Sequence, residues 1–266
     1  MTNPQLNILN AVNEDVRMYG KGSVNKNSLK EKIHELENKV VDIPLIINGK
    51  EVRTERIRNC VKPHDHKHIL ATYCEAGPRE IEMAISTSLE AWKSWSKTSL
   101  EKRAEIFKKA AQLLTNEWRD TINAATMLSQ SKNVFQAEID AACELIDFFN
   151  FNVQFAQEIY NNTELISPED TLNYLQLRPL EGFIFAVTPF NFTSIAANLP
   201  SAPTLMGNVA IWKPASSSVY SGYFLMKMFK EAGLPDGVIN FIPGSGSKIG
   251  KQVLTHKYLA GIHFTG

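Results

Sequence analysis

The segment that most constrains the fold covers residues 182–213, where two short apolar runs enclose a helix-compatible stretch. The runs, residues 183–187 and 209–212, are continuously apolar, which is typical of strands buried on both faces. The stretch between them is long enough for the helical crossover that joins two parallel strands. The segment therefore predicts a strand, helix, strand unit of a parallel sheet, and ligands bind such sheets where the carboxyl ends of the strands open out.

The same alternation continues through the residues that follow. Apolar residues recur at helical spacing over 217–231, and Gly233 and Pro235 then stop that helix. Residues 238–242 and 261–264 predict a third and a fourth buried strand. Four strands with intervening helices predict an α/β fold built on a doubly wound parallel sheet.

The residues before this unit predict a polar arm, a hairpin and a helical region. Residues 1–45 are mostly polar, which indicates an N-terminal arm. Residues 42–53 carry Asn48 and Gly49 between two β-prone runs, and both residue types tolerate positive φ, so we expect a hairpin. A helix should then begin at Pro78, because proline is well tolerated at the first helical position.

Composition excludes several classes of protein. The chain has 266 residues, of which 44% are hydrophobic and 21% charged, with 28 basic and 28 acidic side chains, as in an ordinary globular protein. Without a basic excess or a clustered basic face, we expect no nucleic-acid partner. No apolar run is long enough for a membrane helix, so we expect no membrane partner.

Cysteine usage and the first thirty residues bear on the cellular compartment. Three cysteines without a CxxC motif do not make a disulfide framework, which favours a reducing compartment. The first thirty residues lack an apolar core and contain Glu14 and Asp15, unlike a secretory signal. We expect a cytoplasmic protein, with the mitochondrial matrix as the alternative.

Three motifs allow both a chemical and a structural interpretation. His64, His66 and His68 alternate and could bind a metal from one face of a strand, but a polar loop before a strand at 69–73 is favoured. Asp140 and Glu144 lie one turn apart on a helix predicted over 134–160, where a solvated face is favoured over acid/base chemistry.

The third motif, Ser129 to Lys132, spells the SxxK of serine acyltransferases. The SDN and KTG motifs that accompany it in those enzymes are absent, so we expect a loop at a helix end.

Polar residues follow the predicted strands where a ligand would bind. Asn191 comes just after the first strand, where its amide could stabilise an oxyanion or, alternatively, cap the next helix. Lys213 ends the second strand in an apolar run, and its charge needs a partner there. The glycine-rich residues 244–250 follow the third strand, where bare backbone can approach a dinucleotide.

Several sequence motifs occur together with matching order and spacing. They are PFNF at 189–192, WKPA at 212–215, AGLPDGVINFIPGSG at 232–246 and IHFTG at 262–266. Together they resemble the coenzyme domain of the aldehyde dehydrogenase superfamily. Within it, residues 123–152 and the motif RPLEGF at 178–183 resemble the L-glutamate γ-semialdehyde dehydrogenases, also called pyrroline-5-carboxylate dehydrogenases.

The resemblance implies NAD as cofactor, an aldehyde as substrate, and a role for particular residues. Asn191 would stabilise the oxyanion of the reaction intermediate, while Glu144 and Phe192 would lie near the substrate. Lys213 would bind the cofactor ribose, where many family members add a glutamate at the position of Ser216. The other residues implied in cofactor binding are Thr188, Pro189, Phe190, Gly246, Gly250, Thr265 and Gly266.

The resemblance also implies a division of the chain. Residues 1–45 would form the arm, 46–165 the helical part of the coenzyme domain, 166–181 an oligomerisation hairpin and 182–266 the Rossmann-like NAD-binding part. A homo-oligomer is therefore expected.

The nucleophilic cysteine and the general-base glutamate lie downstream of FTG in the family. Cys60, Cys74 and Cys143 do not stand in the nucleophile's sequence context. Three hypotheses follow: an amino-terminal portion of a glutamate γ-semialdehyde dehydrogenase of proline catabolism, a portion of an enzyme for another aldehyde, or a non-catalytic dinucleotide-binding fragment.

Overall fold

A six-stranded sheet forms the centre of the molecule. The computed structural model describes residues 10–162 and 165–266. The strand order is β3-β2-β8-β7-β6-β9. The four parallel strands are β6 (Phe183–Val187), β7 (Val209–Lys213), β8 (Ile239–Phe241) and β9 (Leu259–Phe264). The predicted parallel sheet is confirmed, with strands within a few residues of the predicted bounds.

The predicted hairpin forms the antiparallel edge of this sheet. Strands β2 (Leu45–Ile47) and β3 (Lys50–Val52) pair with each other, and β2 also pairs with β8. Asn48 and Gly49 both adopt positive φ, at 52° and 68°, as a tight hairpin turn requires.

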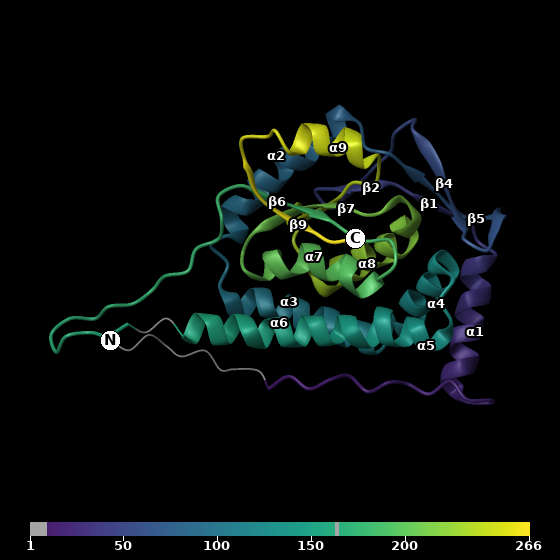
Figure 1. Ribbon diagram of the computed structural model, residues 1–266, viewed down its shortest axis with the longest axis horizontal. Helices are drawn as coiled ribbons and strands as arrows, with labels where there is room; N and C mark the ends of the chain where they lie inside the picture. The colour runs from purple at the N-terminus through teal and green to yellow at the C-terminus, as the bar shows by residue number, and fades with distance from the viewer. Residues whose placement is uncertain (1–9, 163–164) are drawn as a thin grey trace.

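Helices cover both faces of the sheet, as a doubly wound fold requires (Figure 1). On one face lie α2 (Pro78–Trp95) and α9 (Gly246–Val253), and on the other lie α7 (Thr193–Leu205) and α8 (Val219–Ala232). Outside α7 and α8, a further layer contains α3 (Leu100–Thr115), α4 (Arg119–Gln130) and α6 (Glu144–Asn161). The predicted start at Pro78 is confirmed.

Aromatic side chains fill the space between these layers. The rings of Phe107, Phe149 and Phe229 lie within 6.4 Å of one another, centroid to centroid, and join α3, α6 and α8. Trp212 and Phe241 pack edge to face at 5.0 Å between neighbouring strands. The continuous apolar runs are therefore buried on both sides, as their composition predicted.

The helix predicted over 134–160 is interrupted by a wider turn. It consists of α5 (Val134–Ala137), a π-helix (Glu138–Cys143) and α6. The backbone amide of Glu144 donates to the carbonyl of Ile139, the i to i+5 bond of a π-helix. Sequence periodicity gave no signal for this turn.

A second, three-stranded sheet lies beside α1 (Val24–Glu37), with the order β1-β5-β4. Its strands are β1 (Val41–Ile43), β4 (Ile57–Lys62) and β5 (Asp65–Cys74). The loop predicted before a strand at 69–73 is therefore wrong. Strand β5 already begins at Asp65, because its polar residues pair with β4 at an exposed edge.

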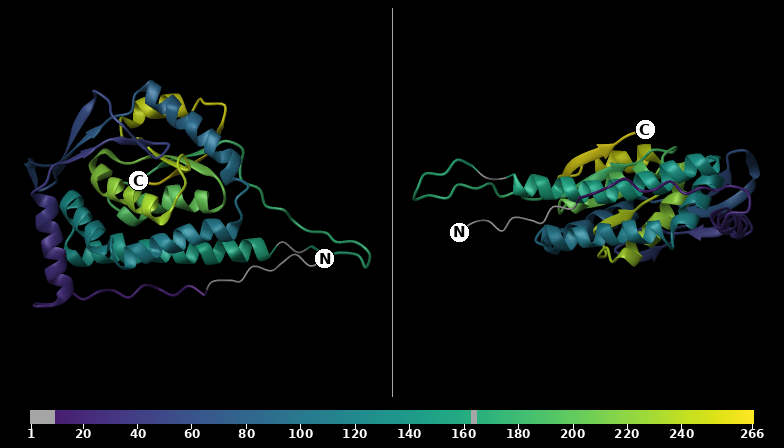
Figure 2. Two further views of the ribbon diagram at one scale, coloured as in Figure 1. Left: turned by 180° about the vertical axis from the view of Figure 1, so that it is seen from behind. Right: turned by 90° about the horizontal axis from the view of Figure 1, so that it is seen from below.

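Two segments run outside these layers. Residues 10–20 lie alongside α6, shown in purple in Figure 1, where the Ala11 and Glu14 amides donate to side chains of Gln154 and Asp147. The segment between α6 and β6 extends away from the body in both views of Figure 2 and returns to it at Leu180, whose carbonyl accepts a hydrogen bond from Trp92 Nε1. Several apolar side chains are exposed on this second segment: Leu165, Ile166, Leu172, Tyr174 and Leu175. Among the described residues, no helix combines the length and apolarity that a membrane crossing requires.

Candidate functional site

The carboxyl ends of the four parallel strands meet at one edge of the sheet. Val187 is in register with Lys213 on one side and with Phe264 on the other. The chain passes from β6 to β7 to β8 in one direction, and β9 then lies on the opposite side of β6. The topological switch point, where such sheets bind ligands, is thus between β6 and β9.

The loop after β6 lies at this switch point. Thr188 is buried, and its Oγ1 accepts a hydrogen bond from Trp212 Nε1 at 2.9 Å. A Cβ placed on Gly266 would lie 3.6 Å from Pro189 Cα, so the residues that follow β9 meet this loop. Phe190 is exposed beside them. The structure therefore brings together the residues predicted around the nicotinamide and the pyrophosphate.

Lys213 is a buried cation at the same edge. It is only 9% exposed, and burial lowers the pKa of its ammonium group. Within the described part of the chain, no hydrogen bond or ion pair holds its Nζ. A buried donor without a protein partner fits a ligand that offers hydroxyl oxygens, as a ribose does.

The glycine-rich turn faces Lys213. Gly246 is the first residue of α9, and a Cβ built on it would lie 3.7 Å from Lys213 Nζ. Gly244 adopts a φ of 151°, which strongly favours glycine. Gly250 lies one turn into α9. A side chain at Gly246 would fill the space beside the ammonium group, so these residues fit the close approach of a dinucleotide.

A hollow of about 600 Å³ lies between α2 and α9, next to this turn. Ser245, Lys248 and Lys251 line it from α9 and its N-cap, and Gly77 and Pro78 line it from the start of α2. The lysines give this side of the turn a positive rim. Ser216, by contrast, is exposed in the short helix after β7.

Asn191 is exposed between β6 and α7. The N-cap residue of α7 is Phe192, which offers no capping side chain, and within residues 10–162 and 165–266 the Asn191 side chain makes no hydrogen bond. The alternative in which Asn191 caps this helix is therefore wrong. Its amide is available to a ligand, as an oxyanion donor must be.

Two carboxylates of the π-helix region approach the start of α7. Ser194 Oγ lies 3.0 Å from Asp140 Oδ1 and 2.5 Å from Glu144 Oε2, and the two carboxylates share its one donor proton. Asp140 is buried and pairs with Lys132, so the predicted solvated face is wrong for Asp140, whereas Glu144 is half-buried. The charges are tolerated inside because Lys132 and the hydroxyl of Ser194 satisfy them.

Lys132 is the residue that sequence reasoning missed. It lies just after α4, at the helix end predicted for the SxxK motif, and Ser131 caps α4 with a left-handed conformation. Lys132 Nζ donates to the backbone carbonyl of Asn191 and to Asp140. Ser129 Oγ donates to the carbonyl of Ala125 within α4, so it is no nucleophile.

Two of the three alternating histidines, His64 and His68, are hydrogen-bonded to other parts of the fold. His64 Nδ1 hydrogen-bonds with Ser131 Oγ at 2.7 Å, and His68 Nε2 with the Glu37 carbonyl at 2.9 Å. In the described ranges, no three His, Cys, Asp or Glu side chains are grouped to hold a metal ion.

All three cysteines are buried and free. Burial is the largest cause that raises the pKa of the Cys60 thiol to about 11 and that of Cys143 to about 12. Neither forms a reactive thiolate at neutral pH.

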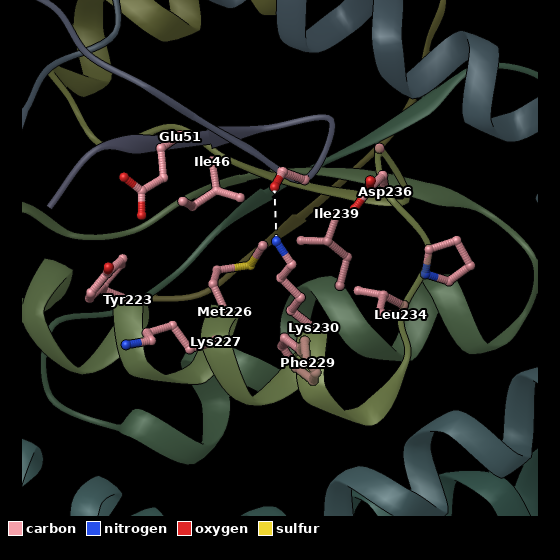
Figure 3. A pocket seen from close by; sticks show the side chains of 13 residues that line it. Ile46, Glu51, Tyr223, Met226, Lys227, Phe229, Lys230, Leu234, Asp236 and Ile239 are labelled. Carbon is pink, nitrogen blue, oxygen red and sulfur yellow. Dashed lines mark hydrogen bonds between the residues drawn. The ribbon is translucent and has the colours of Figure 1, made fainter.

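Another pocket, of about 210 Å³, lies at the opposite edge of the sheet (Figure 3). It is formed by α8, the β2–β3 turn, the residues just before β8, including Leu234, and Ile239 at the start of β8. Lys230 Nζ donates to the Gly49 carbonyl across it at 3.4 Å. Because it is near the amino end of β8, it is separate from the site at the carboxyl ends.

Comparison with known proteins supports the same assignment of the fold. The model of the aldehyde dehydrogenase family matches residues 50–266. The mitochondrial delta-1-pyrroline-5-carboxylate dehydrogenase of Dictyostelium discoideum is 44% identical over 98% of this chain and 47% of its own length. A probable delta-1-pyrroline-5-carboxylate dehydrogenase of Schizosaccharomyces pombe is also 44% identical, over 96% of this chain and 46% of its own length.

Solved structures agree with this similarity. The delta-pyrroline-5-carboxylate dehydrogenase of Mycobacterium tuberculosis, bound with NAD, superposes with a TM-score of 0.96 at 42% identity over 100% of this chain and 49% of its own. A Thermus 1-pyrroline-5-carboxylate dehydrogenase with bound NAD gives a TM-score of 0.88 at 27% identity, over 97% of this chain and 50% of its own. The chain thus spans about half the length of the relatives it matches.

Proposed function

The chain belongs to the aldehyde dehydrogenase family, and we propose that it supplies the NAD-binding part of an enzyme that oxidises L-glutamate γ-semialdehyde to L-glutamate in proline catabolism. The observation that carries this proposal is the similarity to the M. tuberculosis enzyme over the whole chain, at 42% identity. The geometry at the carboxyl ends of β6, β7 and β9 supports it, because donors and bare backbone converge there.

The residues present fit NAD. Lys213 would donate to the ribose hydroxyls. These would accept the hydrogen bonds that water accepts from an exposed ammonium group and that the buried one lacks. Gly246 and Gly250 would let the dinucleotide approach α9, and Thr265 and Gly266 would begin its pyrophosphate loop. Thr188, Pro189 and Phe190 would line the nicotinamide. When bound, the nicotinamide supplies a hydride acceptor.

Asn191 is the catalytic residue that this chain contributes. Its exposed amide would donate to the oxygen of the reacting carbonyl as negative charge develops there. An amide donor is neutral and does not ionise, so it can stabilise that charge without a change in its own protonation state. Glu144 and Phe192, near this loop, are proposed to contact the substrate.

The remaining chemistry requires a thiolate nucleophile and a general base. We place both in residues beyond Gly266, because the relatives are about twice as long as this chain and the cysteines described above are buried. The division into an arm (1–45), a helical part (46–165), an oligomerisation segment (166–181) and an NAD-binding part (182–266) belongs to the same proposal.

Assembly and location are also proposed. The exposed apolar side chains of residues 165–180 would pack against a second copy of the chain, giving a homo-oligomer. We propose a cytoplasmic location, with the mitochondrial matrix as the alternative, which the names of several relatives support.

The test is product identification with the complete product of the gene that encodes this chain. Incubated with glutamate γ-semialdehyde and NAD, it should form glutamate and NADH in equal amounts. A second candidate, an enzyme for another aldehyde, would reduce NAD with other aldehydes and leave this one unchanged. If none of the aldehydes supports NAD reduction by the complete product, both enzyme hypotheses are refuted and a non-catalytic dinucleotide-binding role is left.

A further inference from the structure

One lysine, Lys132, contacts the loop that carries Asn191. Lys132 Nζ donates to the Asn191 carbonyl and lies 4.5 Å from the centre of the Phe192 ring. The same nitrogen pairs with the Asp140 carboxylate. One side chain therefore contacts two successive residues of the loop and anchors them to the π-helix.

Asp140 extends this contact into the start of α7. Its Oδ2 accepts from the Thr193 amide at 3.4 Å, and its Oδ1 accepts from Ser194 Oγ. The Thr193 hydroxyl in turn hydrogen-bonds with Thr126 and Gln130 of α4, at 2.8 Å each. The backbone of residues 191–194 is thus fixed from two elements, although the Asn191 side chain itself is free for a ligand.

The Lys132–Asp140 ion pair is not explained by a contribution to the stability of the fold. The Lys132 and Asp140 side chains are 16% and 6% exposed, and an ion pair removed from water gains little net stability over apolar residues of similar size. Asp140 also lies in a π-helix, a rare form that occurs mostly as single turns and frequently at functional sites. Both the buried ion pair and the π-helix are explained if they hold the loop, and with it the Asn191 donor, in one position.

We infer that Lys132 and Asp140 are positioning residues, which fix the backbone of Asn191 so that its amide is held where the oxyanion forms. This inference rests on the proposed function of Asn191. An oxyanion donor acts at hydrogen-bond distance, and a displacement of about 1 Å can cost about a hundredfold in rate. Loss of the lysine would also leave the Asp140 carboxylate buried without its charged partner.

The experiment uses Lys132→Met and Asp140→Asn in the complete gene product, with Lys132→Arg as the conservative variant. The matched control is Lys62→Met. Lys62 also pairs with a carboxylate, that of Glu37, in a buried setting, but it lies in β4 and has no contact with residues 191–194. The readouts are hydrogen exchange of the peptide covering 188–195, the NAD dissociation constant, and kcat and KM.

We expect faster exchange in residues 189–194 and a kcat lower by about tenfold to a hundredfold in Lys132→Met and Asp140→Asn. The NAD dissociation constant should stay within about twofold, since neither residue belongs to the cofactor edge, and Lys132→Arg should recover part of kcat. In an Asn191→Ala background, Lys132→Met should cost little more, because the donor that it positions is already gone.

Two results would overturn the inference. One is unchanged exchange of 188–195 in Asp140→Asn, which removes the carboxylate charge with almost no change in side-chain size. The other is a loss of kcat that multiplies with that of Asn191→Ala. If the wild-type product does not oxidise glutamate γ-semialdehyde at all, the proposed function fails, while hydrogen exchange still decides whether the pair holds the loop.

Discussion

Lys213 and Gly246 face each other across the edge of the sheet, so that a methyl group added to Gly246 would lie 3.7 Å from the lysine nitrogen. One residue ends β7 and the other begins α9, and the chain between them contains α8 and β8. A charged donor and bare backbone thus meet at the point where NAD is proposed to bind.

The first prediction concerns the opposite effects of Lys213 on stability and binding. Lys213→Met should weaken NAD binding by about tenfold to a hundredfold, because a charged donor is lost. It should also raise the free energy of unfolding by about 1 kcal/mol, because a buried ammonium group without a protein partner is removed. Titration calorimetry and urea unfolding of the complete gene product measure the two effects.

The sign of the pH dependence follows from the lowered pKa of Lys213. The unfolded chain holds this proton more tightly than the folded chain. The free energy of unfolding of the wild type should therefore rise relative to that of Lys213→Met as the pH rises toward 10.5, the ordinary lysine pKa. Lys227→Met, at an exposed lysine of α8, is the control and should change neither quantity. Unaltered NAD affinity in Lys213→Met would refute the ribose assignment.

The second prediction concerns the choice between NAD and NADP. Ser216 is exposed at the carboxyl end of β7, three residues after Lys213. In Ser216→Glu, the new carboxylate should repel the 2′-phosphate of NADP and lower its affinity about tenfold at low salt, while NAD binding is kept. Ser217→Glu, at the next exposed serine, is the matched control. Equal losses in both variants would mean that Ser216 does not face the ribose.

The third prediction concerns the buried pair that ties the N-terminal segment to α4. Arg119 pairs with Glu138, and both are fully buried, while the Arg17 amide and the Tyr19 hydroxyl also donate to Glu138. Burial raises the pKa of Glu138, but these donors outweigh it and hold the pKa below its ordinary value. Glu138→Gln should cost about 1–3 kcal/mol at pH 7, because Arg119 loses one of its two carboxylate partners and keeps Glu14.

The lowered pKa also sets the direction with pH. The contribution of Glu138 is complete above the unfolded value of 4.5 and is lost as the pH falls below it. The difference between wild type and Glu138→Gln in urea unfolding should therefore shrink from pH 7 to pH 3. A difference that grows in acid would contradict this assignment of charge.

The fourth prediction concerns the thiols. Cys60→Ala, Cys74→Ala and Cys143→Ala should each keep NAD-dependent activity in the complete product, since none of these buried groups is the nucleophile. In the 266-residue chain, alkylation by iodoacetamide should be slow until the fold is opened with urea. Rapid alkylation of Cys143 at neutral pH would contradict its raised pKa.

Local patterns predicted the sheet well because each buried strand carries its signal in its own residues. The apolar runs at 183–187 and 209–212 coincide with β6 and β7, and Asn48-Gly49 forms the predicted turn. The strand order could not be predicted in the same way. The placement of β9 next to β6 depends on packing between distant segments, and it determines the switch point.

Charged residues gave the least reliable predictions, since their environment is set by partners far away in the chain. Asp140 was expected on a solvated face, but Lys132 and Ser194 enclose it. Lys132 was considered only as part of a serine acyltransferase motif, although its contact with the Asn191 carbonyl links α4 to the loop after β6. No spacing rule relates residues that are 59 positions apart.

The measurement that tests the account most directly is the rate of glutamate γ-semialdehyde oxidation by the complete gene product and by its Asn191→Ala variant. If the exposed amide stabilises the oxyanion, kcat should fall by about a hundredfold to a thousandfold, with NAD affinity and thermal stability unchanged. An Asn191→Ala enzyme that retains the wild-type kcat would contradict the assignment of Asn191 as the oxyanion donor.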